Sequence, residues 1–250
     1  MKVVVAINTL TSLDNFVYSN HASFYYRMGK MLPRQDDVIL FHPFRMSIDR
    51  MRNEACRVAM ENDAEYIFFI DDDVQIPYDA FFQLRRHDKD VVAGVTYIRG
   101  YPFHPMIFKF REGNSEHYVD DYKEHICDGL VECDAVGFSC CLIKTSLVRK
   151  MSTPYALTGS EHTEDIYFCA KAKAEVPDVG IYVDPNVQTA HKFSSEFIED
   201  HNRKAFKAYC ETMGMKDTKA TGRVDRSEEY LHENGITIKD LESRMWVAQD

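Results

Sequence analysis

The chain has 250 residues, of which 45% are hydrophobic and 28% charged, with a formal net charge of −10. This length suits one large α/β domain or a domain with an appendage, and the composition excludes a largely disordered chain. The acidic balance argues against a broad nucleic-acid footprint, although it leaves room for a local basic groove.

Strand and helix patterns alternate in the first half of the chain. Short β-rich apolar runs predict strands at residues 2–7, 38–41, 66–70 and 91–95. Apolar residues at helical spacing predict helices at residues 20–32, from Ser47 onward and at residues 78–86. Such alternation is typical of a mixed, mostly parallel sheet with helices on both faces.

The second half of the chain shows shorter elements. Strands are expected at residues 106–110, 131–136, 140–143 and, as the last clear one, 179–183; helices are expected from Thr145 and at residues 166–174, 197–212 and 238–247. Residues 111–129 are polar and indicate a surface excursion. We therefore expect one domain at residues 1–195 and a helical C-terminal extension at residues 196–250.

The cysteines and the hydropathy pattern favour a soluble, cytoplasmic protein. The seven cysteines contain no C-x-x-C pair, which favours buried free thiols over disulfides or zinc. No stretch approaches the roughly 20 apolar residues that a membrane span needs. The apolar N-terminus is interrupted by Asn8 and Thr11, so it is better interpreted as a first strand than as a signal peptide.

Three consecutive aspartates, Asp71, Asp72 and Asp73, follow the apolar run at residues 66–70. Their like charges would weaken the fold without a cation, and Mg²⁺ or Mn²⁺ bound to a phosphate ligand resolves that conflict. Adjacent side chains on an extended segment point opposite ways, so all three cannot serve one ion equally. The alternative is an acidic, solvated turn.

Four further motifs occur in a fixed order around these aspartates. They are Arg52-Asn53 on a helix, the segment at residues 137–144 with Phe138 and Ser139, the pair Glu164-Asp165 at the start of a helix, and a late histidine, His191. Over residues 1–195 this ordered set resembles the GT-A glycosyltransferases, particularly the family 2-like nucleotide-sugar transferases. The resemblance implies a GT-A (Rossmann-like) α/β fold.

The resemblance implies a donor site that contains Mn²⁺ or Mg²⁺. The expected metal ligands are Asp71, Asp73 and His191, with Asp73 the preferred direct ligand. The expected donor-binding residues are Asn8, Thr9, Arg52, Asn53, Asp71, Asp72 and Lys192. A structural histidine and an exposed helix surface are the alternatives for His191 and Arg52.

The resemblance also implies an acceptor side. Asp165 matches the carboxylate that acts as general base, with Glu164 beside it, and the helix dipole favours its charged form. Arg99, Tyr101, Phe138 and Ser139 are the expected acceptor-side residues. A helix-start acidic pair and a packed aromatic turn are the alternatives. Residues 158–162 are a candidate lid.

The preferred function is a metal-dependent, inverting glycosyltransferase (a hexosyl- or pentosyltransferase) that uses a nucleotide-sugar, with a UDP-sugar as the expected donor. The acceptor is open, and a glycan or a nucleic acid, including a modified phage-type DNA base, is compatible with the sequence. One alternative is a nucleotidyltransferase, although residues 8–13 lack the glycines of its usual loop. Another is a non-catalytic module that binds nucleotide-sugars or carbohydrate.

Overall fold

The structure of the protein is a computed structural model. It describes residues 1–9, 13–43, 46–110, 116–159, 162–193 and 196–212. The helix expected at residues 238–247 and part of the candidate lid lie outside these ranges. Within them, no helix combines the length and the apolar character needed to cross a membrane.

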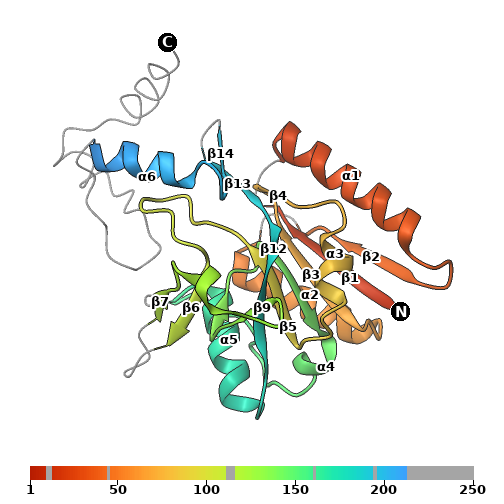
Figure 1. Cartoon of the computed structure of the whole chain (residues 1–250). Coiled ribbons are helices and arrows are strands. Elements are labelled where there is room, and N and C mark those ends of the chain that lie inside the picture. The colour runs from red at the N-terminus through yellow and green to blue at the C-terminus, as the bar shows by residue number, and fades with distance from the viewer. Residues whose placement is uncertain (10–12, 44–45, 111–115, 160–161, 194–195, 213–250) are drawn as a thin grey trace.

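An eight-stranded mixed sheet forms the centre of the molecule (Figure 1). Its strands run in the order β2 (Asp37–Phe41), β1 (Lys2–Asn8), β3 (Tyr66–Asp71), β11 (Cys140–Lys144), β5 (Val91–Val95), β12 (Ile181–Gln188), β9 (Leu130–Glu132) and β8 (Ile126–Cys127). Strand β1 is parallel to β2 and β3, and β12 is parallel to β5. Strand β11 is antiparallel to both neighbours, so the sheet is mixed, as predicted.

Helices cover both faces of this sheet. On β3, Ile67 and Phe69 join one hydrophobic core while Phe68 and Ile70 join the other, because successive side chains of a strand point to opposite faces. Helices α1 (Asn15–Met31) and α3 (Ala80–Arg85) cover the face of Phe68; α2 (Ile48–Glu61), α4 (Thr145–Val148) and α5 (Glu164–Glu175) cover the face of Phe69. The predicted α/β class with helices on both faces is therefore confirmed.

Two three-stranded sheets flank the main one. One consists of β10 (Ala135–Val136), β6 (Ile107–Phe110) and β7 (Glu116–Tyr118), and in the chain η1 (Tyr122–His125) lies between β7 and β10. The other consists of β14 (Glu196–Ile198), β13 (Ala190–Phe193) and β4 (Val74–Gln75). Strand β4 comes directly after the aspartates, and its pairing with β13 places His191 opposite Val74.

Helix α1 begins five residues before its predicted start. Asp14 is its N-cap, and the Asp14 carboxylate accepts a hydrogen bond of 2.8 Å from the amide of Phe16. A capped start satisfies backbone donors that otherwise lack a partner, so the helix can begin in a polar stretch that shows no apolar periodicity.

The C-terminal part contains more strand than the sequence predicts. The strand expected to end at residue 183 continues to Gln188 as β12, across a register shift between Asp184 and Gln188 that accommodates Pro185. Strands β13 and β14 follow, and the expected helix at residues 197–212 is reduced to α6 (Arg203–Thr212). The pairing of β13 with β14 spans the predicted boundary at residue 195.

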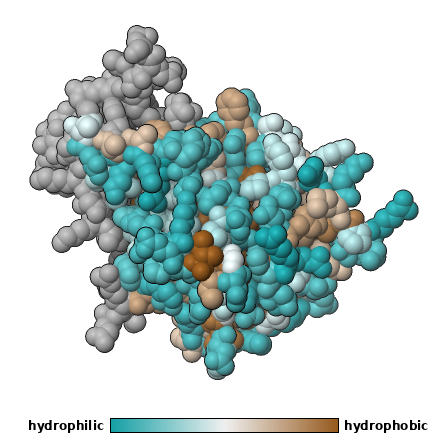
Figure 2. All heavy atoms as spheres, viewed as in Figure 1, coloured by the Kyte–Doolittle hydropathy of each residue, from teal (hydrophilic) through white to brown (hydrophobic). Residues whose placement is uncertain are grey.

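Most of the cysteines lie in the interior, and the visible surface is largely polar. All seven cysteines are free, as predicted, and all except Cys127 are buried. The face shown in Figure 2 is mostly hydrophilic, with separate hydrophobic patches. Exposed large apolar side chains on α1 are Phe16, Tyr18, Tyr26 and Met31.

Candidate active site

The site lies where β1 and β3 end and β11 begins. The parallel register of β1 and β3 places Asn8 beside Asp71. Ser139 directly precedes β11, and its hydroxyl donates a hydrogen bond of 2.8 Å to Oδ2 of Asp71. Carboxyl ends of neighbouring parallel strands are the usual position of binding sites in α/β sheets, and the aspartates occupy this position.

Arg52 of α2 connects Asp71 with the start of α5. Its Nη2 lies 2.7 Å from Oδ1 of Asp71, and its Nε lies 3.4 Å from Oε1 of Glu164. The amide oxygen of Asn8 accepts further hydrogen bonds from the same guanidinium. Arg52 is only 2% exposed, so the alternative of an exposed helix surface is wrong for this residue.

The surroundings of Arg52 keep its guanidinium charged. Burial lowers its pKa, but the carboxylates of Asp71 and Glu164 raise the pKa by more. The guanidinium also lies over the ring of Phe69, 4.8 Å from its centroid, and over the ring of Phe138 at 5.7 Å. A single buried cation therefore links two acidic groups that come from different elements.

Asp73 faces a second set of partners. Its Oδ2 lies 2.8 Å from Nη1 of Arg99, and its Oδ1 lies 3.4 Å from Nε2 of His191. Its carbonyl oxygen accepts a hydrogen bond of 2.8 Å from the amide of Lys192. Burial raises the pKa of Asp73, yet the interactions with His191 and Arg99 outweigh it and hold the pKa below its ordinary value. Asp71 and Asp73 thus have separate partners, and Asp72 between them is half-buried.

His191 is oriented by its other ring nitrogen. Nδ1 lies 2.7 Å from the carbonyl oxygen of Tyr97, and a carbonyl only accepts, so Nδ1 carries the proton. In a neutral ring this leaves the lone pair of Nε2 facing the carboxylate of Asp73. Two electron-rich atoms this close need a proton or a metal ion between them.

The donor atoms of Asp73 and His191 fit a divalent metal whose other ligands come from the substrate. Carboxylate oxygen and imidazole nitrogen both suit Mn²⁺, and such ions often take one or two protein ligands plus phosphate oxygens. No group of three or more His, Cys, Asp or Glu side chains in the described ranges is arranged to hold a metal by itself. Asp71 bonds to the buried Arg52 and to Ser139, whereas the arginine beside Asp73 is exposed, so Asp73 is the better candidate ligand.

Glu164 and Asp165 form a buried acidic pair at the start of α5. Oδ1 of Asp165 accepts hydrogen bonds from the hydroxyl of Thr163 and from the amide of Ile166. Burial, followed by the charge of Asp165, raises the pKa of Glu164 to about 7. Burial also raises the pKa of Asp165, although the hydrogen bonds from Thr163 and Ile166 oppose this. Carboxyl groups of this kind can exchange protons near neutral pH.

Several expected site residues have other partners in the structure. The side chain of Asn53 holds residues 155–156, because its Oδ1 accepts from the amide of Tyr155 at 2.7 Å and its Nδ2 donates to the carbonyl of Ala156. The ammonium of Lys192 pairs with Asp14. Thr9 follows β1 and is half-buried, and the hydroxyl of Tyr101 lies 3.5 Å from Glu211 of α6.

The residues expected on the acceptor side do not lie together in the structure. Ser139 and Arg99 bond to Asp71 and Asp73, so both lie on the side expected for the donor. Phe138 is 1% exposed and stacks on Phe69 at 5.5 Å between ring centroids, so it packs in the core. This burial argues against the predicted contact between Phe138 and an acceptor.

Three groups that hold site side chains in place were not expected from the sequence. The carbonyl of Tyr97 orients His191, Thr163 bonds to Asp165, and Asp14 pairs with Lys192. Thr163 is adjacent to the acidic pair and offers a recognisable sequence signal, since a hydroxyl just before an acidic helix start is a common cap. A backbone carbonyl gives no such signal.

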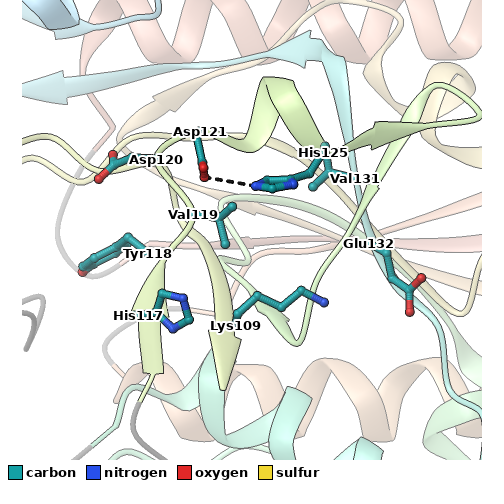
Figure 3. Close-up of a pocket in the computed structure, with 9 residues that line it drawn as sticks. All are labelled: Lys109, His117, Tyr118, Val119, Asp120, Asp121, His125, Val131 and Glu132. Carbon is teal, nitrogen blue, oxygen red and sulfur yellow. Dashed lines mark ion pairs between the residues drawn. The ribbon is translucent and has the colours of Figure 1, made fainter. Parts of the chain in front are cut away.

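A separate polar hollow lies among β6, β7, η1 and β9 (Figure 3). Lys109, His117, Asp121, His125 and Glu132 are among its lining residues. Nε2 of His125 lies 3.3 Å from Oδ1 of Asp121. The hollow includes none of the residues expected to bind donor or metal.

Comparison with known proteins supports the fold. No protein-family model and no curated protein matches the chain. Among solved structures, the chain is similar to A197 from STIV, with a TM-score of 0.54 and 19% identity over 78% of this chain and 87% of that chain. At this identity the likeness shows a shared fold alone.

Two more distant structures are enzymes by their descriptions. One is a 4-diphosphocytidyl-2C-methyl-D-erythritol synthase from Anaerococcus prevotii, with a TM-score of 0.42 and 9% identity over 84% of this chain and 96% of that one. The other is an apo-UDP-glucose pyrophosphorylase, with a TM-score of 0.38 and 8% identity over 84% and 82%. These scores are too low to support an argument about function. The fold class that follows is an α/β protein with a mixed sheet between layers of helices.

Proposed function

We propose that this protein is a metal-dependent glycosyltransferase that moves a sugar from a nucleotide-sugar to an acceptor hydroxyl with inversion. One observation carries the proposal: buried Arg52 joins Asp71, next to the Asp73–His191 pair, to the Glu164–Asp165 pair. Side chains suited to binding a metal ion and a diphosphate are thus linked, at one edge of the sheet, to side chains suited to proton transfer.

Asp73 and His191 would hold Mn²⁺ or Mg²⁺ at the donor end. When bound, the metal supplies positive charge that stabilises the leaving diphosphate. Asp71, fixed by Arg52 and Ser139, keeps the end of β3 in place and offers its carboxylate to donor hydroxyls. Asn8, Thr9 and Asp72 lie close to Asp71 in sequence or register and remain the proposed contacts for the nucleotide.

The Glu164–Asp165 pair would accept the proton at the acceptor end. As the acceptor oxygen forms its bond to the anomeric carbon, its proton passes to a carboxylate of the pair. The bond from that carbon to the donor phosphate breaks, and the nucleoside diphosphate leaves with the electron pair. Arg52 holds Glu164 in position, and its positive charge offsets part of the negative charge of the Glu164–Asp165 pair.

The acceptor is proposed to be a glycan rather than a nucleic acid. Two basic residues of the C-terminal part are engaged within the protein, since Lys192 pairs with Asp14 and Arg203 lies 3.6 Å from Asp120. The net charge of −10 adds to this argument, because phosphate binding depends on accessible cations.

A thermal-shift panel of UDP-, GDP-, CMP- and dTDP-sugars, with and without Mn²⁺, tests the proposal. A ligand that binds the folded state raises the melting temperature by mass action, so one donor should stand out only when Mn²⁺ is present. Asp73→Asn should lose that shift. A panel without any Mn²⁺-dependent shift would contradict the proposal.

Product analysis separates the proposal from nucleotidyl transfer. A glycosyltransferase releases a nucleoside diphosphate, or a monophosphate from a CMP-sugar. A nucleotidyltransferase instead releases pyrophosphate from a nucleoside triphosphate. Pyrophosphate release that requires Glu164 and Asp73 would favour the second class.

A further inference from the structure

One loop, at residues 97–105, supplies Arg99, one partner of Asp73, and orients the other partner, His191. The loop is closed by a bridge between Tyr97 and Pro105 and by a hydrogen bond of 2.9 Å from the amide of Ile98 to the carbonyl of His104. The carbonyl of Tyr97 orients His191, and the guanidinium of Arg99 pairs with Asp73. The loop therefore helps to position both side chains, Arg99 and His191, that lie beside the Asp73 carboxylate.

The backbone of the loop is fixed from behind. The hydroxyl of Tyr97 donates a hydrogen bond of 2.8 Å to Asp200, and the ring of Phe103 packs edge-on against Phe193 and Phe206 at 5.9 Å each. Because these anchors include the buried residues Tyr97 and Phe103, the base of the loop has little freedom.

Arg99 differs from these anchors. Its side chain is 49% exposed, whereas that of Asp73 is 25% exposed, so Arg99 reaches the carboxylate from the solvent side. A long exposed side chain can exchange partners at little cost in packing. His191, held by Tyr97, cannot withdraw in the same way.

We propose that Arg99 occupies the Asp73 carboxylate in the free protein and moves to the donor diphosphate when a divalent cation binds Asp73. This inference rests on the function proposed above and deepens it. A guanidinium and a divalent cation repel each other when they share one carboxylate, so metal alone must displace Arg99. A diphosphate offers the planar guanidinium of Arg99 pairs of acceptor oxygens that it can bind in a bidentate way, and this removes the competition for Asp73.

The consequence is that metal and nucleoside diphosphate bind cooperatively. Each should raise the affinity for the other by the same factor, since coupling between two ligands is reciprocal. Arg99 is thus a donor-binding residue whose contact with Asp73 opposes binding of metal without nucleotide.

Calorimetric titration with Mn²⁺, alone and in the presence of UDP or GDP, tests the inference without measuring turnover. The variants are Arg99→Gln, Asp73→Asn and, as a matched control, Arg149→Gln. The control removes an exposed arginine that pairs with Asp63, which precedes β3 at the end of the strand opposite to Asp71. We expect Arg99→Gln to bind Mn²⁺ alone at least about 5-fold more tightly than wild type, the lower end of typical coupling factors. The same variant should lose most of the gain in Mn²⁺ affinity that the nucleotide gives.

The outcomes separate this inference from the proposed function. If wild type binds Mn²⁺ with nucleotide and Asp73→Asn does not, but Arg99→Gln matches wild type in both titrations, the role of Arg99 is overturned while the metal site stands. If Asp73→Asn binds Mn²⁺ as wild type does, both ideas fail. Arg149→Gln should match wild type throughout, and a change there equal to that of Arg99→Gln would also overturn the inference.

Discussion

At the scale of single residues, Arg52 is the side chain on which the two acidic groups depend. A buried charge is costly unless acceptors surround it, and Asp71, Glu164 and Asn8 provide them. The carboxylates need Arg52 in turn, because without it Asp71 and Glu164 would share a buried region with no compensating cation.

Arg52→Met should lower the free energy of unfolding by about 3–5 kcal/mol, the cost of leaving buried charges unpaired. Arg57→Met is a matched control on the same helix, where Arg57 is half exposed and pairs with Glu54 and Glu61. It should change the free energy of unfolding far less than Arg52→Met does, because solvent screens an exposed ion pair. Urea denaturation of both variants measures the difference, and equal effects would show that the network does not stabilise the fold.

Asp165→Asn should leave donor binding near that of wild type while transfer falls by about 10²–10⁴-fold, the usual contribution of a general base. Glu175→Gln, near the other end of α5, removes an exposed carboxylate that pairs with Lys171 and should have no such effect. Donor affinity and initial transfer rates of the two variants check this. Full transfer by Asp165→Asn would remove Asp165 as the base.

The pH dependence follows from the pKa of Glu164, which burial and the charge of Asp165 raise to about 7. Glu164 and Asp165 are adjacent and interact, so a proton taken up by Glu164 near pH 7 reduces the negative charge that lets the pair accept the acceptor's proton. The transfer rate should therefore fall as the pH drops below about 7 and level off above it. In Glu164→Gln the decline should move to lower pH, because Asp165 loses a charged neighbour. A wild-type profile that stays flat down to the usual pKa of a glutamate would contradict this assignment.

At the scale of elements, backbone pairing rather than a free loop positions the candidate metal ligands. Strand β4 directly follows Asp73, and its antiparallel pairing with β13 sets His191 opposite Val74. The hydrogen bond from the Lys192 amide to the carbonyl of Asp73 extends the contact by one residue. The separation of Asp73 and His191 is therefore determined by strand register.

The close approach of β5 and β12 gives a test at this scale. A Cβ added at Gly94 would lie 2.7 Å from the carbonyl oxygen of Val187, so Gly94→Ala should destabilise the fold by about 1–3 kcal/mol. Gly29 of α1 has no atom within 4 Å of its added Cβ, so Gly29→Ala should stabilise the fold by about 0.5–1 kcal/mol. Chemical denaturation gives both values, and effects of the same sign would contradict the packing described here.

Elements with a strong local pattern were predictable, and those defined by distant contacts were not. The strand at residues 66–70 and the helix after Glu164 follow from apolar periodicity and capping chemistry. The strand that contains His191 was missed because it is formed by pairing with β4, across more than a hundred residues of sequence. The early start of α1 depends on the cap at Asp14.

At the scale of the whole molecule, the sequence predicted the mixed α/β class with helices on both faces, which the structure confirms. The resemblance assigned roles to Asp71, Asp73, Glu164 and Asp165, and those roles stay predictions. It did not predict that Arg99 pairs with Asp73, 26 positions away in the sequence, or that Ser139 bonds to Asp71, 68 positions away. Contacts between side chains so far apart in sequence depend on tertiary packing.

The net charge of the whole molecule gives a test of which class of acceptor it binds. With a net charge of −10, the protein should bind single- or double-stranded DNA weakly, and with little dependence on salt between 50 and 200 mM, roughly the range over which phosphate contacts lose much of their affinity. Fluorescence anisotropy with labelled DNA measures this. Tight binding that weakens steeply with added salt would instead favour a nucleic-acid acceptor.

The most direct test of the proposed metal site is anomalous diffraction from crystals grown with Mn²⁺ and the nucleoside diphosphate of the donor found by thermal shift. We expect one manganese peak within bonding distance of Asp73 and His191, with diphosphate oxygens completing its ligands and Arg99 no longer paired with Asp73. A structure in which nucleotide is bound and manganese is absent from this pair would contradict the proposed site.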